Sequence, residues 1–267
     1  MIELEIFGYF MALVIGTSLG LIGGGGSILA VPVLAYLFSL NETLATSYSL
    51  FVVGASSLVG GLRQSKNNNV DWKTAMVFGL PAIVGVWIVR HYVIPALPEE
   101  LFSIDNFVFT RRMMMFGVFS ILMVWAAYSM LSSKERKGGS GEVKYNYPLI
   151  ITEGLVVGSI TGFVGAGGGF LIIPALVVLA NLEIKKAIGT SLIIIALKSL
   201  LGFFLSDALT LDVDWNFLII FTSIAIAGIF VGVYLGKIID GAKLKKGFGY
   251  FIIVMAIFIF FMEFIIR

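Results

Sequence analysis

The sequence contains no cysteine and only one histidine, His91. The absence of cysteine excludes structural disulfides, thiolate catalysis and thiolate metal sites. Charge is also scarce, because only 13% of the 267 residues are charged, whereas soluble domains carry roughly 25%. Hydrophobic residues make up 59% of the chain, and the mean hydropathy is +1.03. This composition predicts an integral, multi-pass protein of the cell membrane, in contact with membrane lipid.

The few basic residues do not form a patch. The net charge is +2, and the lysines and arginines are spread through short loops, so we expect no nucleic acid partner. The sequence also shows no cofactor motif. GGGGSI lacks the Lys-Ser/Thr of a phosphate-binding loop, and GAGGGF interrupts the G-x-G-x-x-G pattern at Phe170. We therefore expect neither a cofactor nor a metal ion.

Apolar runs follow one another along the chain, and most reach the ~20 residues that span a bilayer. They fall at about 4–22, 27–38, 43–62, 74–95, 110–131, 148–164, 168–180, 186–206, 215–237 and 247–266. The runs at 27–38 and 168–180 are short and follow glycine clusters, which predicts half-helices. The polar stretch from Ser132 to Asn146 predicts a solvated linker. We expect a first transmembrane repeat at 1–131, a basic cytoplasmic linker at 132–147 and a second repeat at 148–267.

The two glycine clusters are versions of one motif. GLIGGGGSILAVP runs from Gly20 to Pro32 and GFVGAGGGFLIIP from Gly162 to Pro174, an offset of 142 (162 − 20). In hydrocarbon, such glycines are tolerable only where they line a cavity or are buried in protein. Corresponding Gly-interrupted segments in two halves of a chain indicate the binding site of a transporter.

Two further matches extend the repeat. Ala45-Thr46-Ser47 corresponds to Gly189-Thr190-Ser191, and Val-Asp-Trp occurs at both 70–72 and 213–215. Because the matches keep the same order in both halves, they indicate an internal duplication.

The distribution of basic residues indicates how the halves are oriented. If each Gly-broken segment returns to the side on which it started, the loops separate under the positive-inside rule. One side then holds Arg63, Lys66, Lys73, Lys134, Arg136, Lys137, Lys144, Lys185, Lys186, Lys237, Lys243, Lys245 and Lys246, and the other holds Arg90, Arg111, Arg112 and Arg267 with acidic loops at 98–105 and 207–214. Three crossings separate the two hairpins, so the second repeat is inverted. The predicted fold is an all-α integral membrane protein of two inverted repeats, each a Gly-broken helical hairpin plus three transmembrane helices.

At these residues the chain resembles the TauE/SafE family, also called the 4-toluene sulfonate uptake permease family. The resemblance rests on the paired G-x-x-G-x-G-G motifs with their following prolines, the downstream Ala-Thr-Ser and Gly-Thr-Ser, and the basic linker in mid-chain. It covers nearly the whole chain. It implies transport of small sulfur-containing anions such as sulfite, sulfoacetate or other organosulfonates, and it leaves the individual substrate and the direction of transport open.

The glycine clusters are the first candidates for substrate binding. A half-helix that begins after a cluster presents free N–H groups and the positive end of its dipole, where an anion fits. Ser27 lies at the expected N-cap of the first half-helix. The alternative is that the glycines only allow close helix packing. The residues concerned are Gly23, Gly24, Gly25 and Gly26 in the first cluster and Gly165, Gly167, Gly168 and Gly169 in the second.

Lys198 lies near the middle of the apolar run 186–206. An ammonium there costs about 2.5–3.5 kcal/mol on insertion scales, which favours a functional role. Lys198 would attract the anion, and the alternative is a lysine that snorkels or forms a structural pair. The corresponding position of the first repeat is Gly54, so the predicted site is asymmetric.

Hydroxyl groups near the starts of two helices are weaker candidates. Thr46 and Ser47 in one half, and Thr190 and Ser191 in the other, can donate to sulfonate oxygens or bond to their own helix backbone. No Asp or Glu falls in the middle of an apolar run. The coupling ion, a proton or a sodium ion, is therefore left open.

Three other functions are alternatives to a secondary transporter. A passive anion channel can use the same half-helices, and sequence does not separate it from a carrier. An intramembrane hydrolase would need a Ser–His pair, which His91 at a helix end does not offer to Ser27 at mid-depth. A structural membrane subunit would have no need of a lysine facing duplicated glycine breaks. The sequence therefore favours a transporter that is not an enzyme and has no catalytic residues.

Overall fold

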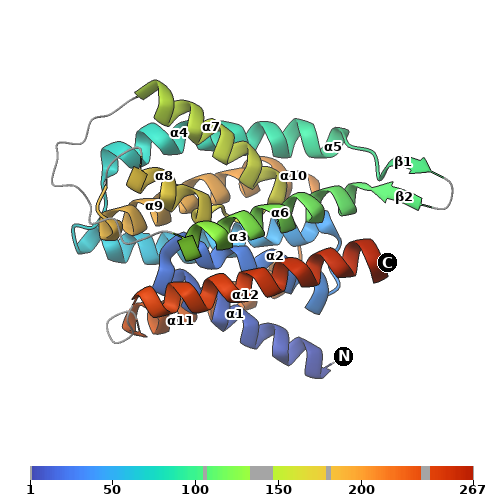
Figure 1. The fold of residues 1–267 in the computed structure, drawn as a ribbon, viewed down its shortest axis with the longest axis horizontal. Helices are drawn as coiled ribbons and strands as arrows, with labels where there is room; N and C mark the ends of the chain where they lie inside the picture. The colour runs from blue at the N-terminus through green and yellow to red at the C-terminus, as the bar shows by residue number, and fades with distance from the viewer. Residues whose placement is uncertain (1, 105–106, 133–146, 179–181, 236–240, 267) are drawn as a thin grey trace.

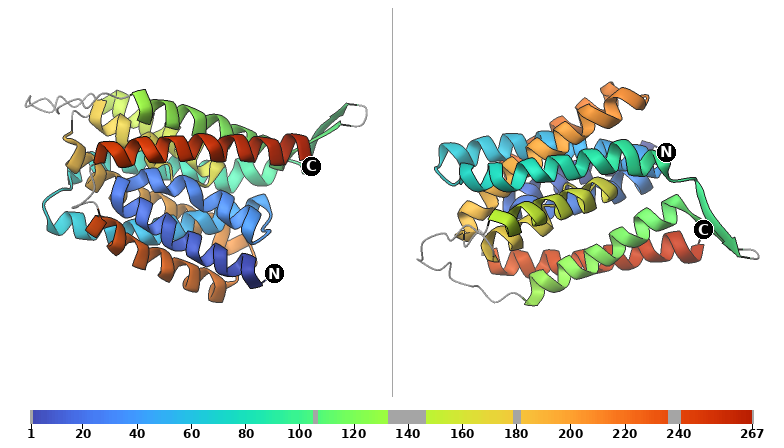
Figure 2. Two further views of the ribbon diagram at one scale, coloured as in Figure 1. Left: turned by 60° about the horizontal axis from the view of Figure 1, so that its bottom comes forward. Right: turned by 90° about the horizontal axis from the view of Figure 1, so that it is seen from above.

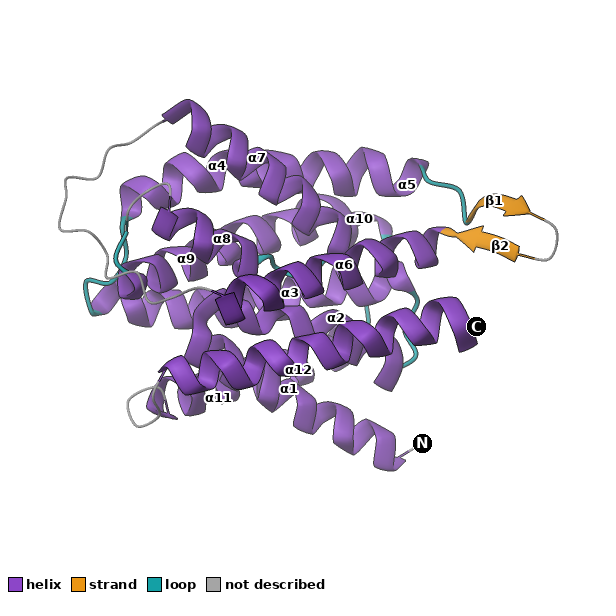
Figure 3. Cartoon of the chain, viewed as in Figure 1, coloured by secondary structure: helices purple, strands orange, loops and turns teal. Residues whose placement is uncertain are grey.

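The computed structural model describes residues 2–104, 107–132, 147–178, 182–235 and 241–266. In these residues the chain forms a bundle of helices with one two-stranded hairpin (Figures 1 and 3). Within the described ranges, seven helices are long and apolar enough to cross a membrane. The predicted all-α membrane class is confirmed.

The first half contains a broken hairpin followed by three long helices. The helix α1 ends at the first glycine cluster, where a 3₁₀ helix, η1, begins. The elements are α1 (Ile2–Ile22), η1 (Gly23–Leu29), α2 (Ala30–Pro32), the π-helical turn η2 (Val33–Leu37), α3 (Glu42–Lys66), α4 (Trp72–Ile88), the π-helical turn η3 (Val89–Val93), α5 (Ile94–Ala96), β1 (Glu100–Ile104), β2 (Phe107–Thr110) and α6 (Arg111–Ser132).

The second half also contains a broken hairpin followed by three long helices, and its described residues include no β hairpin. Its broken hairpin consists of α7 and the shorter α8, which begins at Gly169. The elements are α7 (Tyr147–Val164), α8 (Gly169–Val178), α9 (Ile184–Gly202), the π-helical turn η4 (Phe203–Asp207), α10 (Ala208–Thr210), α11 (Trp215–Leu235), α12 (Gly241–Phe261) and the π-helical turn η5 (Met262–Ile266).

The termini and the β hairpin lie at one end of the bundle (Figures 1 and 2). The helix α7 begins at the opposite end, so the two broken hairpins enter from opposite ends (Figure 1). That the halves are inverted repeats stays a prediction, as do the boundaries of the two repeats. The linker expected at Ser132 to Asn146 lies outside the described residues except for Ser132.

The β hairpin was not predicted, because its acidic start was interpreted as a loop. Strands β1 and β2 pair antiparallel, with Ile104 opposite Phe107. The rings of Phe102 and Phe109 stack with centroids 4.9 Å apart. Cross-strand aromatic pairs stabilise such a hairpin, but strands of five and four residues give little sequence pattern.

The two Val-Asp-Trp segments begin helices, as their sequence indicates. The Asp71 carboxylate accepts a hydrogen bond of 2.8 Å from the N–H of Thr74, and the Asp214 carboxylate accepts one of 3.1 Å from the N–H of Phe217. Both aspartates cap a helix N-terminus. The capping role expected for the two aspartates is confirmed.

Two pairs of helices pack so closely that their backbones touch, and each pair joins one half to the other. A Cβ atom added at Gly16 of α1 would overlap the carbonyl of Ala225 in α11. A Cβ atom added at Gly158 of α7 would overlap the carbonyl of Ala82 in α4. Gly16 and Gly158 differ by 142 positions (158 − 16), the offset of the glycine clusters. We call these two contacts the glycine seams; small residues allow such close approach between membrane helices.

The orientation of the broken hairpins predicts the labelling of single cysteines, which the chain otherwise lacks. In cells, Ser39→Cys at the end of the first hairpin should react with a membrane-impermeant thiol reagent added outside. Glu183→Cys at the end of the second should react only after the membrane is permeabilised. Both positions are exposed, and the basic side should be cytoplasmic. Labelling of both from the same side would contradict the hairpin topology.

Candidate functional site

Both helix breaks require glycine at the same position of the motif. Gly23 has φ +72° and Gly165 has φ +74°, and the two are 142 residues apart (165 − 23). In the second break Gly167 and Gly168 also have positive φ, at +63° and +68°. This conformation is open to glycine at little cost and strained for other residues. The sequence breaks the helices at these points because only glycine fits the turn.

The first break differs from the prediction in its local structure. Gly23, Gly24, Gly25, Gly26 and Ser27 form most of the 3₁₀ helix η1, rather than an unwound segment before a half-helix. Ser27 is therefore not an N-cap. Its hydroxyl donates a 2.7 Å hydrogen bond to the carbonyl of Gly24, because the tight turn brings residues three apart together.

The two breaks meet inside the bundle. A Cβ atom added at Gly24 would overlap the backbone of Gly169, and one added at Gly167 would lie 3.1 Å from the Cβ atom of Ser27. Gly26 packs in the same way on the α1 backbone at Leu19. Glycines in both clusters therefore provide close packing as well as the breaks. The packing that the alternative interpretation describes is present, and a role of these glycines in substrate binding stays a prediction.

The second break leaves unpaired donors at the start of α8. The N–H groups of Leu171 and Ile172 both donate to the carbonyl of Gly168, at 3.0 and 3.1 Å. In the described part of the chain, the N–H groups of Gly169 and Phe170 have no acceptor. Free N–H groups at a helix N-terminus, with the positive end of the helix dipole, form a site for an anion.

Lys198 lies at this same break. The sequence analysis predicted a lysine at mid-membrane depth, close to the glycine breaks. Its side chain is fully buried, and a Cβ atom added at Gly168 would lie 3.4 Å from Lys198 Nζ. The ammonium donates a hydrogen bond to the hydroxyl of Thr161, near the end of α7. The successive glycines 167 and 168 thus contact Ser27 and Lys198, respectively.

The hydroxyl candidates are dispersed. Thr46 contacts Gly165, but its hydroxyl donates to the Glu42 carbonyl at 2.8 Å. Ser191 likewise donates to the Ile188 carbonyl at 2.8 Å. Thr190 accepts from the Asp71 N–H at 2.9 Å, which ties α9 to the start of α4. Thr46 and Ser191 therefore bond to their own helix backbone, as the alternative interpretation describes, whereas Thr190 bonds to the backbone before another helix.

Sequence reasoning missed two buried charges. Arg90 was placed at a helix end and Asp207 in a loop, yet their exposed fractions are only 3% and 5%. They form an ion pair of 2.9 Å, and Ser47 lies beside the Asp207 carboxylate. Lys198 is therefore not the only buried basic residue. The available signal was the position of Arg90 inside an apolar run that continues through Val93.

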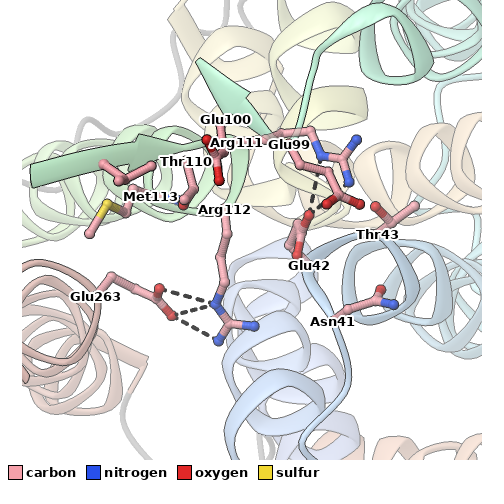
Figure 4. Close-up of a pocket in the computed structure, with 11 residues that line it drawn as sticks. Asn41, Glu42, Thr43, Glu99, Glu100, Thr110, Arg111, Arg112, Met113 and Glu263 are labelled. Atoms are coloured by element: carbon pink, nitrogen blue, oxygen red, sulfur yellow. Dashed lines mark hydrogen bonds and ion pairs between the residues drawn. The ribbon is translucent and has the colours of Figure 1, made fainter. Parts of the chain in front are cut away.

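A pocket of about 490 Å³ lies at the end of the bundle that holds the β hairpin. It lies among the starts of α3 and α6, the β hairpin and η5 (Figure 4). Two ion pairs line it: Arg111–Glu42 at 3.0 Å and Arg112–Glu263 at 2.8 Å. Each arginine in this pocket is therefore neutralised by a carboxylate.

The site offers no hydrolytic pair. The ring of His91 stacks on Trp87 with centroids 5.5 Å apart, whereas the Ser27 hydroxyl is bonded within η1. Among the described residues, no group of three or more His, Asp or Glu residues is arranged to hold a metal ion.

Comparisons with known proteins identify the family of the chain. The family model described as sulfite exporter TauE/SafE matches residues 9–259. A probable membrane transporter protein of Xylella fastidiosa strain 9a5c is 28% identical over 92% of this chain and 90% of its own length. The probable membrane transporter protein YunE of Bacillus subtilis is 29% identical over 77% of this chain and 78% of its own. No solved structure matches.

These relatives are named as probable membrane transporters. A further relative, the probable membrane transporter protein MJ0441 of Methanocaldococcus jannaschii, is 28% identical over 72% of this chain and 70% of its own length. The matched region contains both glycine breaks, Lys198 and both glycine seams. On this evidence the chain, a multi-pass membrane protein, belongs to the TauE/SafE family of membrane transporters and is not an enzyme.

Proposed function

We propose that this transporter carries small sulfur-containing anions, such as sulfite, sulfoacetate or other organosulfonates, and binds them at the start of α8. The observation that supports the site most directly is the position of Lys198, fully buried beside unpaired N–H groups. A buried ammonium without a carboxylate partner has an uncompensated charge. A small anion would supply the missing charge.

The anion would take the place of Thr161 on the lysine. The Thr161 hydroxyl is a neutral acceptor, and a hydrogen bond between two charged groups is roughly twice as strong as a neutral one. A sulfonate has three oxygens, which suits the ammonium on one side and the N–H groups of Gly169 and Phe170 on another. The substrate class itself is suggested by the family description.

The transport mechanism we propose is alternating access around this fixed site. The glycine seams join α1 to α11 and α4 to α7 across the two halves. Separating a seam would expose closely packed backbones. We therefore expect each rigid body that moves during transport to contain a seamed pair, α1 with α11 or α4 with α7, rather than one half of the sequence. A coupling proton or sodium ion is compatible with the proposal.

The test is thermal stabilisation of the detergent-purified protein by sulfite, sulfate, sulfoacetate, taurine and simple carboxylates. A ligand that binds only the folded state stabilises it by RT ln(1 + [L]/Kd). We expect sulfite or a sulfonate to raise the melting temperature and carboxylates of similar size to do so less. Equal stabilisation by all of the anions would contradict a sulfur-anion carrier.

A passive anion channel is the second candidate, because the same unpaired N–H groups would serve it. Counterflow separates the two. Proteoliposomes loaded with unlabelled anion should accumulate labelled anion transiently if the protein is a carrier, and a channel shows no such overshoot.

A further inference from the structure

A buried ion pair contacts the same helix, α7, as Lys198 of the proposed anion site. Arg90 lies in η3 and Asp207 in η4, and Arg90 Nη1 is 2.9 Å from Asp207 Oδ2. The Nε–H of the same guanidinium donates to the carbonyl of Gly162, in α7, at 2.8 Å. One side chain thus joins three elements, and two of them are π-helical turns, which occur often at functional sites.

The pair is not fully satisfied. Arg90 Nη2 and the hydroxyl of Ser206 are buried and have no hydrogen-bond partner among the described residues. Ser47 places a further hydroxyl beside the Asp207 carboxylate. Buried donors in native proteins are nearly always paired, so a buried guanidinium with a free NH₂ group indicates a missing acceptor.

The ion pair and Lys198 hold consecutive residues of α7. Lys198 donates to the side chain of Thr161, and Arg90 donates to the carbonyl of Gly162. Asp207 follows Lys198 by nine residues (207 − 198), or about 13 Å of helical rise. The pair therefore lies between the proposed site and the end of the bundle to which η3 and η4 lead.

We propose that Arg90 is a second anion-binding group, at which a substrate anion takes the place of the Asp207 carboxylate on its way between Lys198 and the β-hairpin end. This inference rests on the proposed function. The Nη1 and Nη2 groups form one edge of the guanidinium, and this edge binds two oxygens of a carboxylate or of a sulfur oxyanion equally well. Asp207 occupies Nη1 only, and Nη2 is free.

The exchange has a structural consequence. When the anion binds the Nη1–Nη2 edge, Asp207 loses its partner, and the ion pair between η3 and η4 is broken. The Nε–H bond to Gly162 is on another edge of the guanidinium and remains. Arrival of the anion would therefore release the ends of α4 and α9 from each other while α7 stays held.

The experiment compares Asp207→Asn with Glu42→Gln by equilibrium binding of sulfite and sulfoacetate to the purified protein. Both changes replace a carboxylate that pairs with an arginine by its amide, and Glu42 lies at the rim of the bundle. Asp207→Asn lacks the carboxylate that competes with the anion for Arg90. This variant should therefore bind two anions per chain, or bind a single anion with an affinity at least about ten-fold higher than that of wild type. Glu42→Gln should bind as wild type does.

The Lys198→Met variant distinguishes failure of this inference from failure of the proposed function. If Lys198→Met abolishes binding and Asp207→Asn binds as wild type does, Arg90 is not an anion site, and the proposed function stands. If wild type binds neither anion, both are wrong. In the double variant Lys198→Met/Asp207→Asn, one anion per chain should remain.

A second variant tests the inference if Asp207→Asn does not fold. In Arg90→Gln/Asp207→Asn both charges are absent, and the amides can pair. This protein should still bind one anion at Lys198 but transport it at least about ten-fold more slowly, since one step of the route has lost its cation. Transport at the wild-type rate would show that the ion pair is only structural.

Discussion

Replacement of Lys198 by methionine is expected to abolish anion-induced stabilisation and transport, and replacement by alanine should do the same. Two opposite charges 4 Å apart interact by about 4 kcal/mol at an effective dielectric constant of 20. Loss of even three-quarters of this energy corresponds to a weakening of the affinity by roughly 100-fold. The measurements are the thermal shift with each anion and uptake into proteoliposomes.

The Lys198→Met protein should still fold. The change removes a fully buried ammonium, whose cost in the membrane is considerable, and methionine fills a similar volume. Lys186→Met is the matched control, because Lys186 is an exposed lysine of the same helix. An unchanged thermal shift in Lys198→Met would assign Lys198 a structural role and leave the anion site unlocated.

Replacement of Gly24 by alanine should cause a large loss of stability without altering the backbone conformation that this position requires. The added Cβ atom would overlap the backbone of Gly169, which cannot move without separating the two breaks. Overpacking costs about 1–3 kcal/mol where side chains can adjust, and we expect the upper part of this range or more. The melting temperature should fall by on the order of 5–10 °C.

Gly79→Ala is the control for this prediction. Gly79 is buried within α4, and a Cβ atom added there would meet only Ile194, at an ordinary 3.8 Å. Alanine is the better helix former, so the control should be as stable as wild type or slightly more stable. Equal melting temperatures for both variants would show that the breaks are not in tight contact.

Replacement of Gly168 by leucine would also fill the proposed site. The structure gives Gly168 a φ of +68° and places Thr161 against it. Leucine would be strained there as well as crowded. Lys198→Met is therefore the sharper test of binding, and loss of binding in Gly168→Leu should be accompanied by loss of stability.

The membrane class, the helix breaks and the buried lysine could be predicted because each leaves a local mark in the sequence. A lysine surrounded by apolar residues and glycines in an apolar run are costly unless the fold uses them. Glycine is needed at positions 23 and 165 because φ is positive there. This requirement concerns the backbone of one residue and does not depend on a distant partner.

The partners of these residues could not be predicted, because they depend on packing between distant segments. Lys198 and Thr161 are 37 positions apart, and Arg90 and Asp207 are 117 apart. Each charge of the latter pair looks like a loop residue when read alone, since it stands near the end of an apolar run. The contact of η1 with the second break likewise joins segments that are far apart in the sequence.

The glycine seam between α1 and α11 also bears on how the protein is made. Ala225, the residue on which Gly16 packs, is the 209th residue that the ribosome adds after Gly16 (225 − 16). At roughly 5–20 residues per second this takes on the order of 10–40 s. During that time the face of α1 that carries Gly16 lacks its packing partner. Lipid tails or an insertion chaperone must cover this face until α11 is synthesised.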